Sequence, residues 1–438
     1  MSLSGVFAAT QHVGSAQTER ILGDASNLTQ LTRHGALRGP GEGLSALSAP
    51  PDNLEALGRE LEGRAEARAE AIFAFLCAEL GFVRATERLE GDLACAAIQG
   101  STLWIRRGRV GREPLVWAEI PGGIAFSTQP RALARALELP LVGPETFEER
   151  GVFLPPDTPW RGLRALAPGE GLCVSPAGVK RLPPEPLSSL AGRAGKPEIW
   201  AKALHNALSL ATARVGVPFS LSLSDGLASG VLRELLRRRE PGLLTVGVDV
   251  PGADRSIPLP EPSLLRELPL DAPLGDPTLL LDAAALRAAP PGGLVSGRGA
   301  AEILGGILPR APRARLRALV RGPDGRAAEA LDRARRELPE RTLAPLLQIA
   351  QGRRLETPYA TALVVGVAAL IPAEHLRGRA LLNAAFAELL SPELRGREHR
   401  APEVPLTEWL RALGEEPGAD PGRAWRRAAW RVWREGLP

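Results

Sequence analysis

The sequence is poor in lysine, and nearly all of its basic residues are arginine. Lysine occurs only at Lys180, Lys196 and Lys202, against 54 basic and 50 acidic residues in total. With abundant alanine, proline and glycine, one methionine and one tyrosine, this usage indicates a GC-rich coding bias. The arginines are spread along the chain and alternate with glutamates, so we expect no stripe that follows a nucleic-acid backbone and no nucleic-acid partner.

Cysteine and long apolar runs are also scarce. Cys77, Cys95 and Cys173 are odd in number, widely spaced and set in apolar runs, which predicts buried thiols in a reducing compartment. The longest apolar run, near 362–371, is too short to cross a bilayer, and no secretory signal pattern opens the chain. We therefore expect a cytoplasmic protein. The histidines and cysteines show no spacing typical of a metal site, so none is predicted.

The length of 438 residues and the change of pattern along the chain predict two domains. Residues 1–185 combine one strong helix pattern at 53–80 with alternating apolar runs that are typical of strands. A Pro/Ser/Gly-rich stretch at 183–197 is the expected linker. Residues 198–438 begin with the order helix, strand, loop, helix, strand, which predicts a parallel sheet flanked by helices, and continue with mostly helical patterns.

The most informative segment is 222–230, which reads S-L-S-D-G-L-A-S-G after the apolar strand P-F-S-L-S-L-S. It resembles the pyrophosphate-binding loop S-G-G-x-D-S-S, in which backbone N–H groups surround phosphates and an acidic residue holds Mg²⁺. Ala228 replaces that acidic residue, and Asp225 places a carboxylate where an anion would sit. One interpretation is a capped strand-to-helix turn, with Gly226 required by an unusual backbone angle or a close approach.

The other interpretation is that weak nucleotide binding is retained. The residues that would then bind the nucleotide are Ser222, Ser224, Asp225, Gly226, Ser229, Gly297 and Glu302.

Further segments agree in order with the asparagine synthetase family. L-E-G-D-L-A-C-A-A-I (89–98), R-G-R-V-G-R-E-P-L (107–115) and L-V-S-G-R-G-A-A-E-I-L-G-G (294–306) resemble its L-x-G-x-F-A-F-A, R-D-x-x-G-x-x-P-L and L-S-G-x-G-A-D-E-L-F-G-G segments. Over essentially its whole length the chain resembles a degenerate member of this family, of the glutamine-hydrolysing class B type, related to β-lactam synthetases and lasso-peptide cyclases.

The resemblance implies an α/β and α+β fold in two domains. The first, 1–185, would be an Ntn-hydrolase-like αββα sandwich of the glutamine amidotransferase type. The second, 198–438, would be a PP-loop ATP-pyrophosphatase domain, like the adenine nucleotide α-hydrolases, with a parallel sheet and added helices.

The glutaminase half of the family depends on an N-terminal cysteine whose free amine acts as its base. The matching position here is Ser4, three residues inside the chain, and Ser2 is out of register. The stretch between Pro40 and Asn53 is too short for the family's glutamine-holding strands and loop. We expect glutaminase activity to be lost.

In the synthetase half, the resemblance implies that two aspartates hold Mg²⁺ against pyrophosphate. Ala228 and Ala301 occupy those positions, and the remaining carboxylate, Glu302, rarely holds Mg²⁺ by itself. The family's lysine corresponds to His399, which is charged only near or below a pKa of about 6.5. The family's arginine corresponds to Glu356, which reverses a charge.

The C-terminal stretch 423–436 combines tryptophans with arginines. Trp425, Arg426, Trp430 and Trp433 form a candidate partner-binding surface, because both residue types anchor interfaces. The alternative is a terminal helix whose tryptophans pack on the core. Binding to a membrane surface is the weaker option.

The sequence therefore predicts a catalytically degenerate asparagine-synthetase-like protein that acts as a binding, scaffold or regulatory partner. The partner would be a protein or peptide, such as an active homologue or a biosynthetic enzyme, and no cofactor is expected. The alternative is a diverged ATP-dependent amide-bond ligase without glutaminase activity, which would use ATP and Mg²⁺ and form an acyl-adenylate. The oligomeric state is left open.

Overall fold

The structure is a computed structural model, in which two compact units can be distinguished. It describes residues 3–8, 30–31, 35–38, 45–48, 51–60, 69–184, 196–304, 333–350, 352–372, 375–376, 380–396 and 403–437. The first unit contains Met1–Gly143 and Phe153–Pro186, and the second contains Pro144–Val152 and Leu187–Pro438. The chain thus enters the second unit for a short segment before it completes the first, an excursion for which the sequence shows no signal.

The first unit contains two antiparallel sheets in its described residues. One has the order β2-β3-β1-β8-β7-β9, with β1 Ser4–Ala8, β2 Gln30–Leu31, β3 Gly35–Arg38, β7 Val116–Ile120, β8 Gly123–Ser127 and β9 Arg164–Ala165. The other has the order β11-β10-β6-β5-β4, with β4 Ser45–Leu47, β5 Cys95–Gln99, β6 Thr102–Arg106, β10 Gly171–Ser175 and β11 Gly178–Leu182. The strands expected from the alternating runs between 93 and 127 are confirmed.

Two apolar clusters hold this unit together. The first combines side chains from both sheets, including Phe7, Ile105 and Phe126, all fully shielded from solvent. The second joins the five-stranded sheet to the helices α2 Leu54–Glu60, α3 Ala69–Leu80 and α4 Phe82–Arg88, while α5 Pro130–Ala136 packs on β8. Burial of these side chains is the main stabilising contribution. The helix expected at 53–80 corresponds to α2 and α3, with 61–68 outside the described residues.

The prediction that all three cysteines are buried is wrong for Cys173. Cys77 and Cys95 are buried free thiols, and burial raises the pKa of Cys77 to about 12. Cys173 is only half-buried, because alternation along β10 turns it away from the core side occupied by Leu172 and Val174.

The second unit is built on a parallel sheet with the order β14-β13-β12-β15-β16. The strands are β12 Phe219–Ser222, β13 Thr245–Val248, β14 Arg255–Ile257, β15 Gly293–Val295 and β16 Leu355–Glu356. The strand order reverses its direction between β12 and β15, and in open α/β sheets ligands bind outside the carboxyl ends of the strands at such a point. β16 interrupts the region that the sequence pattern assigned to helices.

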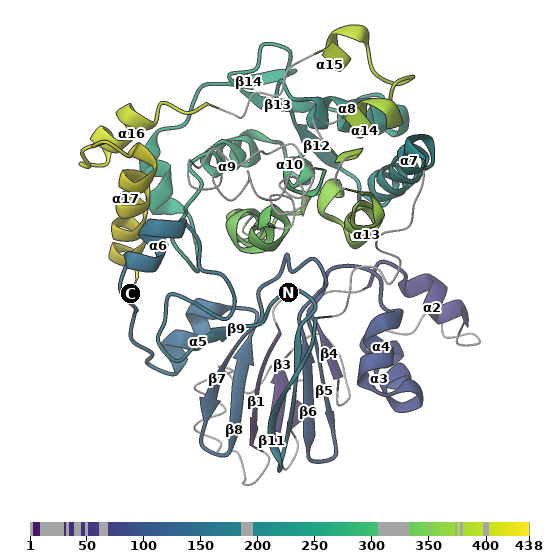
Figure 1. Ribbon diagram of the computed structural model, residues 1–438, viewed down its shortest axis with the longest axis vertical. Helices are drawn as coiled ribbons and strands as arrows, with labels where there is room; N and C mark the ends of the chain where they lie inside the picture. The colour runs from purple at the N-terminus through teal and green to yellow at the C-terminus, as the bar shows by residue number, and fades with distance from the viewer. Residues whose placement is uncertain are drawn as a thin grey trace, which may run out of the picture. The chain divides into compact units, whose positions relative to one another are not determined.

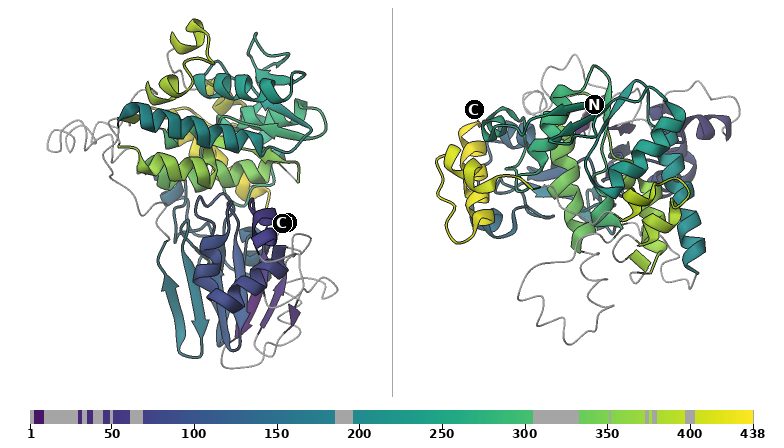
Figure 2. Two further views of the ribbon diagram at one scale, coloured as in Figure 1. Left: turned by 90° about the vertical axis from the view of Figure 1, so that its right-hand side faces the viewer. Right: turned by 90° about the horizontal axis from the view of Figure 1, so that it is seen from above.

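Helices surround this sheet, and α7 and α13 lie side by side (Figure 2). The α-helices are α6 Glu145–Arg150, α7 Pro197–Ala213, α8 Leu227–Arg239, α9 Leu279–Ala288, α10 Ala300–Ile303, α12 Ala344–Ile349, α13 Ala362–Leu370, α14 Ala380–Ala385, α15 Pro392–Gly396, α16 Leu406–Ala412 and α17 Pro421–Glu435. The 3-10 helices η2 Pro262–Glu267 and η4 Pro358–Ala360 and the π-helix η3 Pro339–Leu343 complete the unit's described helical segments. Among the described residues, no helix has both the length and the apolar character that a bilayer span requires. α6, from the excursion of the chain, packs against α17 (Figure 1).

Arginine side chains cap the carboxyl ends of several of these helices. Arg239 donates hydrogen bonds to Ala213 O (3.0 Å) and Val215 O (2.6 Å) at the end of α7. Arg431 donates to Leu413 O (2.6 Å) at the end of α16. The last carbonyl groups of a helix lack intrahelical donors and carry partial negative charge, so a guanidinium satisfies both needs. The abundant arginine therefore has a structural use in this unit.

Candidate functional site

Three loops meet at the carboxyl ends of β12, β15 and β16. A Cβ atom on Gly297 would lie 3.3 Å from Ser229 N, so the loop 296–299 touches the first turn of α8. The buried Tyr359 hydroxyl donates to Ala228 O (3.0 Å) and joins the third loop to the same turn. This convergence lies at the switch point of the sheet, and we take it as the candidate site.

The hydroxyl groups of the first loop are used within the loop. Ser229 Oγ lies 2.8 Å from Ser224 O and 3.0 Å from Gly226 O, and it accepts from Ser224 N at 3.2 Å. Ser224 Oγ lies 3.0 Å from Ser229 Oγ and accepts from Gly226 N at 3.3 Å. These contacts describe a closed strand-to-helix turn, but the side-chain cap expected from the sequence is not made among the described residues, because Gly226 takes the N-cap position of α8.

Exposure differs along this loop. Ser224 and Asp225 are exposed, Ser222 and Gly226 are half-buried, and Ala228 and Ser229 are buried. An unusual backbone angle does not explain Gly226, because its φ of −82° is open to any residue. A Cβ atom there would lie 3.3 Å from Ser224 Oγ.

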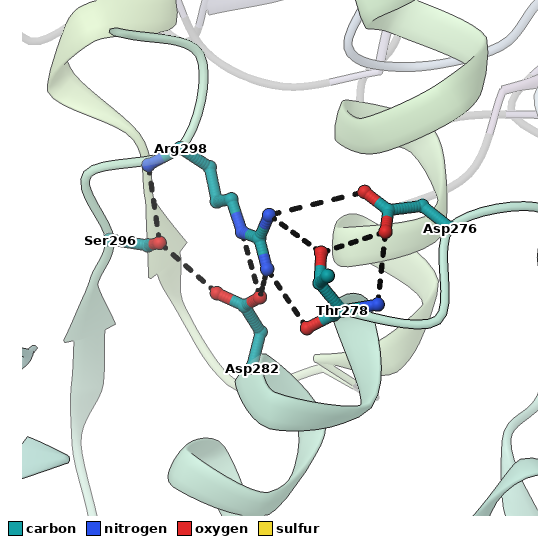
Figure 3. A network of polar contacts seen from close by, with 5 residues as sticks. All are labelled: Asp276, Thr278, Asp282, Ser296 and Arg298. Carbon is teal, nitrogen blue, oxygen red and sulfur yellow. Dashed lines mark hydrogen bonds and ion pairs between the residues drawn. The ribbon is translucent and has the colours of Figure 1, made fainter. Parts of the chain in front are cut away.

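The second loop is held by the side chain of Arg298 (Figure 3). Its guanidinium donates to Asp282 (Nε to Oδ2, 2.8 Å) and to Thr278 (2.9 Å to O, 3.0 Å to Oγ1). Although burial alone would lower the pKa of Arg298, the carboxylates of Asp282 and Asp276 raise it. The cation of this loop is therefore neutralised by its own chain.

The remaining positions of the site are only partly accessible. Ala301 and Glu302 are half-buried in the first turn of α10, and Glu356 is half-buried in β16, where its carbonyl accepts from Ser296 N (2.8 Å). Burial raises the pKa of the Glu302 carboxyl, and the charge of Arg298 opposes that shift. His399 lies outside the described residues.

The tryptophans of α17 do not form a surface, which corrects the partner-binding candidate. Trp425, Trp430 and Trp433 are 0%, 5% and 7% exposed. The indole N–H of Trp425 donates to Leu274 O (2.9 Å), and that of Trp433 donates to Leu270 O (3.0 Å). Arg426 is half-buried and donates to a carbonyl of α6. The aromatic face of α17 therefore packs on its own chain, with hydrogen bonds to Leu270 and Leu274.

In the first unit, Ser4 begins β1 and lies opposite Ser127, where β8 ends. The two hydroxyl oxygens are 2.7 Å apart, and Ser4 is buried. Leu3 N donates to Thr128 Oγ1 (2.9 Å), which secures the same end of the strand pair. Ser2 lies outside the described residues.

Two carboxyl groups that the sequence analysis did not single out lie at this end of the unit. Asp92 accepts from the backbone N–H groups of Val110 (3.1 Å), Gly111 (2.9 Å) and Arg112. A Cβ atom on Gly108 would collide with the Asp92 carboxylate. That carboxylate thus occupies the space next to the position where the family resemblance implies an aspartate. A signal for this was present in the sequence. Asp92 lies in the mostly apolar run 89–98, shortly before the motif 107–115, which has Gly108 at the position of the aspartate.

Glu113 is the second missed group and makes stability depend on pH. Burial raises its pKa from 4.5 to about 7, opposed by a hydrogen bond from Ser48 and assisted by the charge of Asp92. Between these two pH values the folded protein holds a proton that the unfolded chain has lost. The stabilisation is therefore complete below pH 4.5 and disappears as pH rises through 7.

We expect Glu113→Gln to remove this dependence. The variant should gain up to about 3 kcal/mol relative to the native chain between pH 4.5 and 8, measured by urea unfolding at several pH values. Glu119→Gln, at an exposed position of β7, is the control and should follow the native curve. Parallel curves for native protein and Glu113→Gln would show that Glu113 titrates normally.

Comparisons with known proteins give no family assignment. No family model matches the sequence, and no curated protein matches it. Among solved structures, the chain is similar to glutamine phosphoribosylpyrophosphate (PRPP) amidotransferase from B. subtilis complexed with ADP and GMP, at 11% identity and a TM-score of 0.28, covering 68% of this chain and 75% of that one. A second, "structure of the allosteric regulatory enzyme of purine biosynthesis", has 11% identity and a TM-score of 0.28, covering 82% and 74%. At these TM-scores neither likeness carries an argument about this chain.

Proposed function

We propose that this chain is a non-catalytic binding protein, a degenerate member of the asparagine synthetase family with an Ntn-hydrolase-like first domain and a PP-loop-like second domain. The closed first turn of α8 is the observation that carries this proposal. Ser229 Oγ is used within the loop, Ala228 O is bound by Tyr359, and Gly297 packs on Ser229 N. A phosphate group would have to displace these contacts to reach the turn.

The charges around the turn support the same proposal. Asp225 adds an exposed negative charge, while the positive charge of Arg298 is neutralised by Asp282 (2.6 Å). The positions where the family holds Mg²⁺ carry methyl groups, at Ala228 and Ala301. An approaching polyphosphate would meet repulsion and find no compensating cation from this loop pair.

The first unit and the composition are consistent with a binding role. The Ser4 hydroxyl is engaged by Ser127, which supports the loss of glutaminase activity. The buried thiols of Cys77 and Cys95 support a reducing, cytoplasmic location. We propose a protein or peptide as the partner. An intact synthetase or peptide-modifying enzyme encoded near its gene is the first to test, by titration of the purified proteins.

The direct test is nucleotide binding. We expect no saturable rise in melting temperature with ATP and Mg²⁺, whereas a ligand at 100 times its Kd would add about 2.7 kcal/mol. We also expect no ATP–pyrophosphate exchange with candidate carboxylic acids. The control is Ser175→Ala, which changes a serine of β10. If exchange occurs, is abolished by Ser224→Ala and is kept by Ser175→Ala, the chain is a diverged amide-bond ligase and the proposed binding role is wrong.

A further inference from the structure

The segment 144–152, which we call the strap, is a short part of the second unit that interrupts the first unit along the chain. It contains α6 and belongs to the second unit, whereas its chain neighbours Gly143 and Phe153 belong to the first. The strap is therefore the one stretch described within the second unit that is covalently joined at both ends to the first. Its contacts within the second unit show which parts of that unit a movement of the strap would affect.

Two arginines and an aromatic pair hold the strap in place. Arg426 Nε donates to Glu148 O (2.5 Å), and Arg341 donates to Arg150 O (3.0 Å), so both cap the last carbonyls of α6. Phe147, 1% exposed, packs against Trp430 with ring centroids 6.2 Å apart. The strap is thus held on α17 by side-chain contacts that single substitutions can remove.

The end of the strap presses on the backbone that precedes Asp276. Gly151 adopts a left-handed conformation (φ 72°), and a Cβ atom on Gly275 would collide with the carbonyl of Gly151. The neighbouring Leu274 O is held by Trp425 (2.9 Å). The two backbones are therefore in close contact at this point, so a shift of one is opposed by the other.

From Asp276 a short polar chain leads to the candidate site (Figure 3). Asp276 Oδ1 accepts from Thr278 N (2.9 Å) and Thr278 Oγ1 (2.7 Å). Thr278 in turn accepts from Arg298 through O (2.9 Å) and Oγ1 (3.0 Å). Arg298 belongs to the loop 296–299, whose Gly297 packs on the first turn of α8. Three residues thus join the strap contact to the site loop.

A second link runs through Arg341. The guanidinium that caps Arg150 O also bonds to Glu337 Oε2 (2.7 Å). Its charge acts on Glu302, where it opposes the rise of the carboxyl pKa that burial causes. The strap therefore has contacts leading to both ends of the segment 298–302.

We propose that the strap is a conformational control element of the candidate site. Seated on α17 and Gly275, it holds the loop 296–299 closed on α8, and its displacement releases that loop. Since both ends of the strap continue into the first unit, a partner that binds the first unit acts on the site through this segment. The inference goes beyond the proposed function, because it holds whether the site binds a protein or a nucleotide.

Hydrogen exchange of the full-length protein, followed by mass spectrometry, tests this coupling. Arg426→Gln removes the cap on Glu148 O, and we expect about tenfold faster exchange in both 144–152 and 293–304. Arg427→Gln changes the next residue on α17, whose exposed side chain bonds to Glu415, and should change neither segment. Thr278→Val removes the two hydroxyl contacts of the polar chain, to Asp276 and from Arg298, and should loosen 293–304 while leaving the strap protected.

Two outcomes would overturn the proposal. One is that Arg426→Gln loosens the strap while exchange in 293–304 stays at the native rate, which would show that the two segments open independently. The other is native exchange in both segments, which would show that Arg426 does not seat the strap. If Arg426→Gln fails to fold, Gly275→Ala takes its place, because it separates the strap from residue 275 by a steric clash and should accelerate exchange in both segments.

Discussion

Replacing Arg298 with glutamine destabilises the second unit by about 3–5 kcal/mol, because it leaves a buried carboxylate without its counter-charge. Asp282 is 5% exposed and bonds to Arg298 at 2.6 Å and 2.8 Å. Its remaining partner within the part of the chain that the structure describes is the hydroxyl of Ser296 (3.2 Å), which cannot neutralise the charge. Urea unfolding of the native protein and the variant, followed by tryptophan fluorescence, measures the loss.

Arg287→Gln is the matched control for this prediction. Arg287 forms an ion pair with Glu267 at 2.8 Å, but both side chains are about half exposed. Exposed pairs contribute about 0–1 kcal/mol, so this variant should remain close to the native protein. The apolar double replacement Arg298→Met with Asp282→Leu should recover most of the lost stability. Equal, small effects of Arg287→Gln and Arg298→Gln would contradict the role assigned to Asp282.

Replacing Trp425 with alanine costs about 3–5 kcal/mol, because it empties a large volume inside the unit. Trp425 is fully shielded from solvent, lies 6.2 Å from Trp409 between ring centroids, and donates to Leu274 O. Trp425→Phe keeps most of the volume and removes the donor, so it should cost about 1–3 kcal/mol, the penalty of an unpaired buried carbonyl. Thermal unfolding of the three proteins separates packing from hydrogen bonding.

Leu210→Ala on α7 serves as the reference for this series. Leu210 is 45% exposed, so its truncation should change stability by less than about 0.5 kcal/mol. A loss below 1 kcal/mol for Trp425→Ala would mean that α17 is loosely attached in solution. Its tryptophans would then return as candidates for a partner surface.

Local pattern was sufficient to predict the elements around the candidate site. The apolar run before Ser222, the small polar residues after it and the helical spacing beyond Leu227 specify a strand, a turn and a helix, and each depends on neighbours in the sequence. Parallel pairing of β12 and β13 followed from the intervening helix α8. The alternating runs of the first unit gave β5 to β8 for the same reason.

The contacts that define the chemistry of the site could not be predicted in this way. Arginine is frequent throughout the sequence, and nothing in the residues near Arg298 indicates that Asp282 and Thr278 will neutralise it. Asp92 lies 16 residues before Gly108, and only the folded chain places its carboxylate beside that glycine. In each case, packing between elements that are distant along the sequence determines which side chains lie next to each other.

The sequence by itself determined the mixed α/β character of the chain, the order of its elements and the replacement of acidic residues by Ala228 and Ala301. Composition and periodicity carry such information because they are read from neighbouring residues. Tertiary structure decided that the aromatic face of α17 is buried, that the strap belongs to the second unit, and that Ser229 and Arg298 are satisfied internally. An apolar helix face must be buried, but its sequence does not say which surface covers it. Likewise, a buried hydrogen-bond donor must find an acceptor, but its sequence does not say which one.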